Sequence, residues 1–227
     1  MTVVYDTKQS PPKDPSRKVV KRRQRGRPRL EQVADIEREL VEVALTEFLK
    51  NGYADTSMGM IVKAAGISKT TLYSRFSSKK ELFVAMMQEM AEGDLSTQIR
   101  ADPSPSRSLE DMLCELAFRS LEIGLDPVHS GVIRLIYGES HRLPELRAAG
   151  EILARTTMSS ILNVMTGYAE REGLVFRNPS VPARLLMLML RGCHLDVLQS
   201  GDMVLGDERR GEISYFIRLL AASKDEW

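Results

Sequence analysis

The chain is poor in the residues that form disulfide frameworks, metal centres and most catalytic sites. Its 227 residues include two cysteines, three histidines and one tryptophan, and aromatic residues make up only 6%. Cys114 and Cys193 stand far apart, and neither lies in a spacing typical of a metal site. No nucleophile elbow, phosphate-binding loop or paired-carboxylate arrangement is present. We therefore expect no enzyme, no cofactor and no metal.

Long apolar segments are also missing. The longest unbroken apolar run is Leu185–Leu190, far shorter than the roughly 20 residues that a membrane-spanning helix needs. The N-terminus has no signal-peptide pattern, and two isolated cysteines fit a reducing compartment, so we expect a cytoplasmic protein. No segment shows sustained alternation of polar and apolar residues, which excludes an extensive sheet and predicts an all-α protein.

Charge is distributed unevenly along the chain, although the net charge is only +1. Residues 1–34 contain ten Lys or Arg against three acidic residues, which leaves residues 35–227 with a net charge of −6. The same segment is rich in Pro and Ser and has too few apolar residues to build a core. We predict a disordered basic arm over residues 1–34, and basic arms bind polyanions such as DNA.

Within this arm, glycine and proline separate three arginines: Arg25, Arg27 and Arg29. Glycine allows close approach in a narrow groove and proline keeps the chain extended, so these arginines could enter an A·T-rich minor groove. The stretch resembles the core of an AT-hook. The alternative is a plain basic tail that binds phosphates without reading sequence.

A helical pattern of apolar residues begins at Asp35. It ends at Asn51-Gly52, where glycine can adopt a left-handed conformation. Thr56 or Ser57 caps a second helix, Ser68 starts a third, and Ser78 with Glu81 forms a capping box for a fourth that runs to about residue 100. Further helices are predicted at about 108–124, 127–139, 144–172, 181–200 and 208–223.

The stretch "GISKTTLYSRF", residues 66–76, has few apolar side chains that could anchor it in a core. Leu72 and Phe76 anchor it with Ile67, and its other side chains are hydrogen-bond donors. The preceding Ala64-Ala65-Gly66 permits close packing and a sharp turn, as in a helix-turn-helix. A polar outer face is what a helix needs to enter the major groove of DNA.

The segment "TSMGMIVKAAGISKTTLYSRFSSKKELF" resembles the DNA-binding domain of the TetR family of bacterial regulators, with a match over about residues 36–85. The resemblance implies a DNA-binding domain at 35–82 and a ligand-binding and dimerisation domain at 83–227. It implies that residues at the start of the third helix contact bases, and that residues at other positions contact phosphates or flanking bases. The implied DNA-binding residues are Ser68, Lys69 and Thr70 for bases, and Thr71, Tyr73, Arg75, Thr56, Ser57, Met58 and Lys79 for the rest.

The C-terminal half is predicted to form a helical bundle. The helix at about 181–200 is apolar on more than one face, which suits either a monomer's central core or, with the helix at about 208–223, a homodimer interface. The segment 132–151 loosely resembles an AefR-like subgroup of the same family, which suggests a hydrophobic small-molecule effector. Candidate effector-binding residues are Met86, Met90, Met112, His129, Arg134, Tyr137, His141 and Met158, although core packing is the simpler role for most of the methionines.

Together with the resemblance to the TetR family, whose members commonly repress, these features predict a homodimeric repressor that binds an inverted-repeat operator and is released by an effector. A second hypothesis is a DNA-binding protein without an effector, in which the basic arm dominates and binding shows little sequence preference. An enzyme in the C-terminal half is the third and weakest hypothesis.

Overall fold

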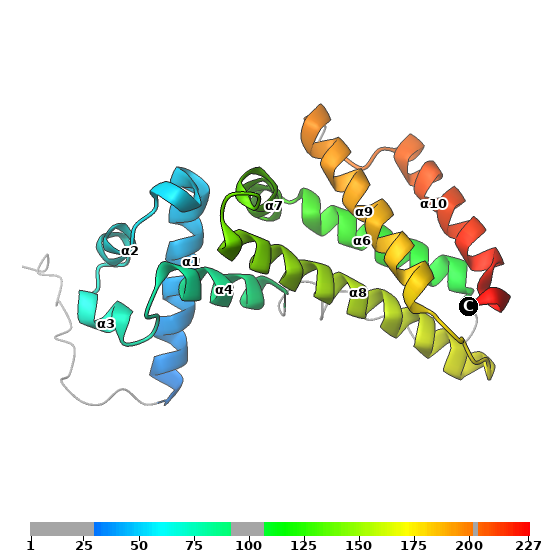
Figure 1. Cartoon of the computed structure of the whole chain (residues 1–227), viewed down its shortest axis with the longest axis horizontal. Helices are drawn as coiled ribbons and strands as arrows, with labels where there is room; N and C mark the ends of the chain where they lie inside the picture. Colours follow the sequence, from blue (N-terminus) through cyan, green and yellow to red (C-terminus); the bar gives the residue numbers. More distant parts are fainter. Residues whose placement is uncertain (1–29, 92–106, 202–203) are drawn as a thin grey trace, which may run out of the picture.

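The computed structural model describes residues 30–91, 107–201 and 204–227, with side chains from residue 35 onward (Figure 1). Every regular element in these ranges is helical, which confirms the predicted fold class. The helices are α1 (Leu30–Asp55), α2 (Met58–Ala65), α3 (Lys69–Tyr73), α4 (Lys79–Met90), α6 (Leu109–Leu125), α7 (Pro127–Glu139), α8 (Pro144–Glu172), α9 (Ser180–Ser200), α10 (Asp207–Ala222) and the 3₁₀ helix η2 (Lys224–Glu226). Arg25, Arg27 and Arg29 lie outside the described residues, as does any continuation of α4 towards residue 100.

Gly66 ends α2 as the sequence predicts, whereas Gly52 only interrupts α1, which runs to Asp55; α1 also begins at Leu30, so residues 30–34 are helical and not part of a disordered arm. Gly52 has φ 79° and ψ 165°, which interrupts α1 one turn before its end. Gly66 adopts the left-handed conformation after α2, where its N–H donates to Lys63 and Val62 carbonyls. Such backbone angles are strained for residues with a Cβ, so both glycines fix the course of the chain into the helix-turn-helix.

Serines begin α2, α3 and α4. The side chain of Ser57 accepts from the Met60 N–H, and the side chain of Ser68 accepts from the Thr71 N–H. Ser78 accepts from the Glu81 N–H, but Glu81 does not return the bond to Ser78. Its carboxylate instead accepts from the N–H and hydroxyl of Ser77, at 2.7 and 2.6 Å. The predicted capping box is thus displaced by one residue.

One hydrophobic core joins the N-terminal helices to part of the C-terminal half. Phe48, Tyr53 and Phe83 pack ring against ring, with centroids 5.0–5.4 Å apart. The same core includes Val132 and Ile136 of α7 and residues of early α8. It also includes Leu82 and Phe83, which lie on either side of the predicted boundary between the two domains, so no gap in packing marks that boundary.

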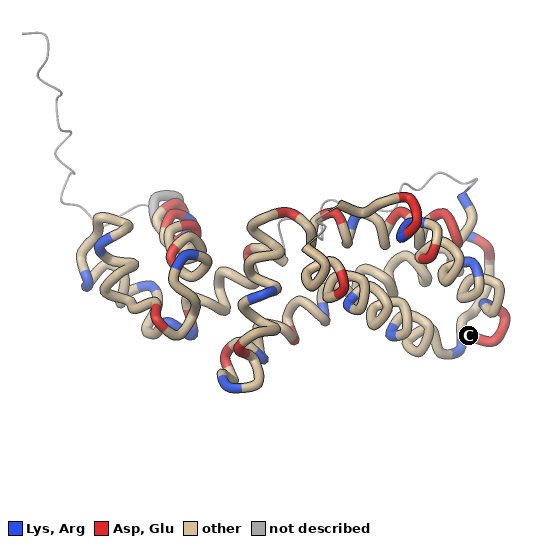
Figure 2. The backbone as a smooth tube through the Cα atoms, turned by 90° about the horizontal axis from the view of Figure 1, so that it is seen from above, with Lys and Arg blue, Asp and Glu red and all other residues tan. Residues whose placement is uncertain are grey.

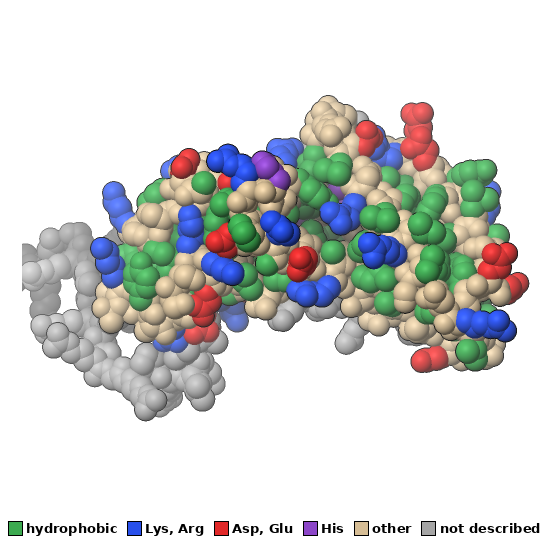
Figure 3. Space-filling view, in the orientation of Figure 1, with side chains coloured by type: hydrophobic (Ala, Val, Ile, Leu, Met, Phe, Trp, Pro, Cys, Tyr) green, Lys and Arg blue, Asp and Glu red, His purple; other side chains and the backbone are tan. Residues whose placement is uncertain are grey.

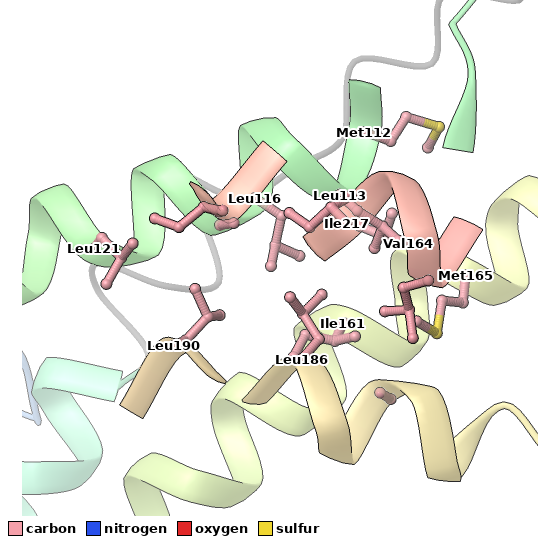
Figure 4. Close-up of a cluster of buried hydrophobic side chains, with 14 of the residues drawn as sticks. Met112, Leu113, Leu116, Leu121, Ile161, Val164, Met165, Leu186, Leu190 and Ile217 are labelled. Atoms are coloured by element: carbon pink, nitrogen blue, oxygen red, sulfur yellow. The ribbon is translucent and has the colours of Figure 1, made fainter. Parts of the chain in front are cut away.

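A second core lies inside the bundle of α6, α8, α9 and α10 (Figure 4). Leu116, Ile161 and Leu186 meet there from three helices, and Ile217 joins them from α10. The long helix α8 connects this core with the N-terminal core, so the molecule is elongated, with α2 and α3 at one end and the bundle at the other (Figure 1). Across the described ranges no helix is both long and apolar enough to cross a membrane.

Candidate DNA-binding surface and ligand cavity

The outer surface of α3 consists of polar side chains that point away from the core. Leu72 is fully buried and Phe76 nearly so, which fixes the helix against α1 and α2. On the opposite side Ser68, Lys69 and Thr70 are exposed, and Tyr73 is 51% exposed. The first residues of α3 therefore offer hydroxyl and ammonium donors at the tip of the molecule.

Basic side chains surround this tip. Lys63 at the end of α2 and Lys80 at the start of α4 are exposed, as is Lys69. Figure 2 shows basic positions at the end of the molecule formed by α2, α3 and the start of α4, whereas acidic positions run along α1. The phosphates of a DNA backbone would therefore be attracted to the basic side chains at the end of the molecule that carries α2 and α3.

Two residues expected to touch DNA at the start of α2 have their side chains inside the protein. Thr56 is 1% exposed, and its hydroxyl donates to the carbonyls of Glu47 and Gly52 at 3.1 and 2.7 Å. Met58 is 9% exposed and belongs to the N-terminal core. A phosphate contact from Thr56 or Met58 would therefore have to come from the backbone, and Ser57 and Gly59 are the exposed residues beside them.

Two expected phosphate ligands are engaged within the chain instead. Arg75 forms an ion pair with Glu37 of α1, at 3.0 Å from Nη1 to Oε1. Lys79 donates to three carbonyl oxygens, those of Tyr53 at 2.7 Å, Ala54 at 3.1 Å and Thr56 at 2.8 Å. Its ammonium also lies 4.5 Å from the centre of the Tyr53 ring. In this structure both cations hold the helix-turn-helix together rather than face outward.

A cavity of about 280 Å³ lies between the two cores. Its walls come from α4, α6, α7, the turn after α7, α8 and α9. Residues that line it are Met87, Met90, Ala91, Ser120, Ile123, Gly124, His129, Val132, Ile133, Ile136, Tyr137, Ser140, Arg147, Gly150, Glu151, Leu153, Ala154, Thr157, Met187, Leu190, Arg191 and His194. Its volume is near the lower limit for small-molecule sites, and its lining is mainly apolar with a few polar groups, as such sites usually are.

The polar groups divide between the interior and the rim. Arg147, Glu151 and Arg191 are exposed at the rim, where blue side chains border a recess in the middle of Figure 3. Arg191 donates from Nε to the Tyr137 hydroxyl at 3.1 Å. Deeper in the cavity, Nε2 of His194 is buried and has no hydrogen-bond partner among the described residues. Burial lowers the pKa of His194, which keeps its imidazole neutral near pH 7.

The predicted effector residues divide into two groups. Met90, His129 and Tyr137 line the cavity. Met86 is buried in the N-terminal core, Met112 and Met158 belong to the bundle core, and Arg134 and His141 are exposed. These five do not line this cavity: His141 lies in the turn after α7, and the other four project from other faces of their helices.

Sequence reasoning missed Arg147, Glu151 and Arg191 as cavity residues. The sequence does offer a signal for His194, which is a polar residue in the largely apolar helix predicted at about 181–200. Arg191 and His194 are three residues apart on α9, and Arg147 and Glu151 are four apart on α8, so each pair shares a helix face. That spacing could have suggested a common site, but it does not say which face meets a cavity.

The lack of a side chain at Gly124 of α6 leaves room for the His194 ring. A Cβ added to Gly124 would lie 1.9 Å from His194 Nε2, so the ring occupies the space that any side chain would need. We expect Gly124→Ala to reduce the free energy of unfolding by about 1–3 kcal/mol through this overlap. In a His194→Ala background the same change should stabilise the protein, because alanine favours helix by about 1 kcal/mol over glycine.

Urea unfolding of the original protein, the two single variants and the double variant, all at the same protein concentration, measures this double-mutant cycle. Gly167→Ala is the control, because nothing lies within 4 Å of its added Cβ, and it should stabilise in both backgrounds. Equal effects of Gly124→Ala with and without His194 would contradict the proposed packing of the ring.

Comparisons with known proteins agree with the helix-turn-helix geometry. Residues 40–86 match the profile of the family described as "Bacterial regulatory proteins, tetR family". The probable acrEF/envCD operon repressor of Escherichia coli K12 is 21% identical over 169 residues, 71% of this chain and 74% of that protein. The transcriptional regulator AcrR of Shigella flexneri is 28% identical over 87 residues, which cover 37% of this chain and 40% of that protein.

Solved structures of regulators share the fold along most of the chain. The flavonoid-responsive regulator FrrA superposes with a TM-score of 0.67 and 25% identity, over 84% of this chain and 97% of that one. Salmonella enterica GusR superposes with a TM-score of 0.66 and 23% identity, over 83% and 96%. Residues 40–86 thus have the sequence pattern of the tetR family of bacterial regulatory proteins, and most of the chain has the fold of these solved structures.

Proposed function

We propose that the protein is a homodimeric repressor that binds an inverted-repeat operator and releases it when a small molecule enters the cavity. The observation on which this rests most is the position of α4. The helix begins beside α3 and contributes Met87 and Met90 to the cavity wall. One helix, α4, therefore links a ligand in the cavity to the DNA-binding helix α3.

An apolar face on α9 and α10 supports the dimer. Val181, Leu185 and Leu188 of α9 recur on one face and are 47–55% exposed. Tyr215 and Leu219 of α10 are 61% and 55% exposed. We call these five residues the α9–α10 face; it belongs to the bundle end of the molecule, where green side chains gather in Figure 3. A face this apolar fits a second copy of the chain better than it fits water.

Two glycines continue this face. Gly192 follows Leu188 by four residues, and Gly211 precedes Tyr215 by four. An added Cβ at either would meet no atom within 4 Å, so packing within the chain does not call for glycine there. Glycine inside a helix costs about 1 kcal/mol, and a close approach by a partner helix would offset that cost.

The coupling from cavity to DNA follows from the shared core. Val132 and Ile136 line the cavity and also pack in the core that contains Phe48 and Phe83. A ligand that displaces α7 or α4 must therefore displace the DNA-binding helices. In a dimer the two α3 helices must lie about 34–36 Å apart to enter successive major grooves, so a small displacement weakens many contacts together.

Selection from random duplex DNA at near-physiological salt tests the proposal. An enriched inverted repeat supports a dimeric repressor, and A·T enrichment beside the half-sites supports minor-groove binding by the arm. Binding without enrichment would refute the operator and favour non-specific binding through the basic arm.

Lys69 provides a test of base reading by α3. Lys69→Ala should remove about 1–3 kcal/mol of discrimination at one operator position in each half-site, because the ammonium is exposed at the start of α3. Competition binding against operators substituted at each position measures the change. Lys224→Ala, in η2 at the far end of the molecule, is the control and should leave the base preference unchanged. A preference unaltered by Lys69→Ala would place the base contacts elsewhere on the surface.

A further inference from the structure

The fixed charges around the cavity favour an anion. Of the residues that line it, Arg147 and Arg191 are basic and Glu151 is acidic; burial keeps His194 neutral, and Nδ1 of His129 lies 3.2 Å from the carboxylate of Asp126. The lining thus has an excess of positive charge. No described carboxylate lies within ion-pair distance of Arg147 or Arg191. An anionic group entering at the rim would therefore meet two uncompensated guanidinium groups.

Arg191 is oriented for a planar anion. Its Nε donates to the hydroxyl of Tyr137 at 3.1 Å, and its guanidinium carbon lies 5.7 Å from the centre of the same ring. Tyr137 thereby fixes one edge of the guanidinium, and the two Nη groups donate to no described residue. Their fork geometry matches the two oxygens of a carboxylate, and an oriented fork loses less side-chain entropy when it binds.

The cavity interior is suited to an apolar body. Methionine and branched side chains line it from three helices: Met87, Met90, Val132, Ile133, Ile136 and Leu190. Methionine adapts its shape to irregular ligands. The charged rim and the apolar interior together define an amphipathic site.

We propose that the effector is a small amphipathic carboxylate. Its carboxylate is bound by the Nη edge of Arg191 with Arg147 as the second cation, and its apolar body extends to Met87 and Met90 of α4. This inference rests on the proposed function for its regulatory meaning, but the binding itself does not. A carboxylate at Arg191 and a body against α4 would connect recognition of the head group to the position of the DNA-binding helices.

Matched ligands test the head group. Octanoate, decanoate and 4-phenylbutanoate are each compared with their methyl ester and with the primary amine of the same body, below micellar concentrations. Calorimetric titration of the full-length protein without DNA measures the affinities. We expect at least one acid to bind about tenfold or more tightly than its ester and its amine. Acids that bind no better than their esters, or amines that bind best through Glu151, would overturn the proposal.

Variants of the rim test the residues. Arg191→Gln should abolish the preference for acid over ester while leaving ester binding unchanged, and Tyr137→Phe should weaken acid binding several-fold. Arg142→Gln is the matched control, since Arg142 is exposed in the turn after α7 and does not line the cavity. Thermal unfolding of each variant without ligand shows whether it folds. A preference for acid that survives Arg191→Gln would refute the assignment.

Operator binding is measured separately, so the two proposals can fail separately. An acid that binds through Arg191 and leaves operator affinity unchanged supports the ligand class and refutes release by that ligand. An operator released by an ester or amine, with no acid bound, supports a ligand-responsive repressor and refutes the carboxylate.

Discussion

Leu188→Glu should convert the protein to a monomer and reduce its affinity for an inverted-repeat operator by about 100-fold or more. Leu188 is 47% exposed in the middle of the α9–α10 face. In a two-fold dimer the new carboxylates of both copies would be buried near one another without partners, at a cost that an interface of ordinary size cannot offset. A monomer loses the second half-site, and linked binding of two sites contributes factors of roughly 10² to 10⁴.

Light scattering gives the mass in solution, and titration of operator DNA gives the affinity. Val128→Glu is the control, because Val128 is an exposed apolar residue in the first turn of α7, away from α9 and α10. A carboxylate there is compatible with the helix dipole, so we expect a folded dimer with unchanged operator affinity. If Leu188→Glu remained a dimer, a different surface would have to form the interface.

The sequence predicted the helices well because their signals are local. Ser57, Ser68 and Ser78 begin helices through bonds to N–H groups only three residues away. Gly66 ends one through its own backbone conformation. Apolar spacing marked the buried positions Leu40, Ala44 and Phe48 of α1 in the same way. None of these depends on which distant segment packs against the helix.

Side-chain roles were predicted less well, since they depend on partners far along the chain. Thr56 looked like an exposed cap, but its hydroxyl bonds the carbonyl of Glu47 in α1. Met86 and Met90 looked equivalent, but only Met90 faces the cavity. The rim residues Arg147 and Arg191 come from helices that meet only in the folded protein. Sequence spacing shows which residues share a helix face, not what that face contacts.

Lys79 shows the same limitation with the largest functional consequence. The resemblance to the TetR family implies a phosphate contact from this lysine at the start of the fourth helix. In the structure its ammonium donates to the carbonyls of Tyr53, Ala54 and Thr56, which end α1 and lead into α2. Burial lowers the pKa of Lys79, as expected for an ammonium partly removed from water. The residue thus connects three helices of the DNA-binding domain.

Lys79→Met should therefore reduce the free energy of unfolding by about 2–3 kcal/mol, because three carbonyl groups lose a charged donor. It should also weaken operator binding, because α4 and the turn before α2 lose their common support. Lys80→Met is the matched control, since Lys80 is adjacent but exposed. That variant should keep its stability and, if Lys80 contacts a phosphate, lower the dependence of log affinity on log salt by about one.

Urea unfolding and operator titrations at several salt concentrations separate the two roles of these lysines. A structural role for Lys79 predicts a lower urea midpoint and weaker operator binding, with the slope against salt nearly unchanged because no phosphate contact is lost. If Lys79→Met left stability intact and lowered the salt slope by about one, Lys79 would leave the three carbonyls to bind a phosphate in the complex, and the ammonium would be exchanged between protein and DNA.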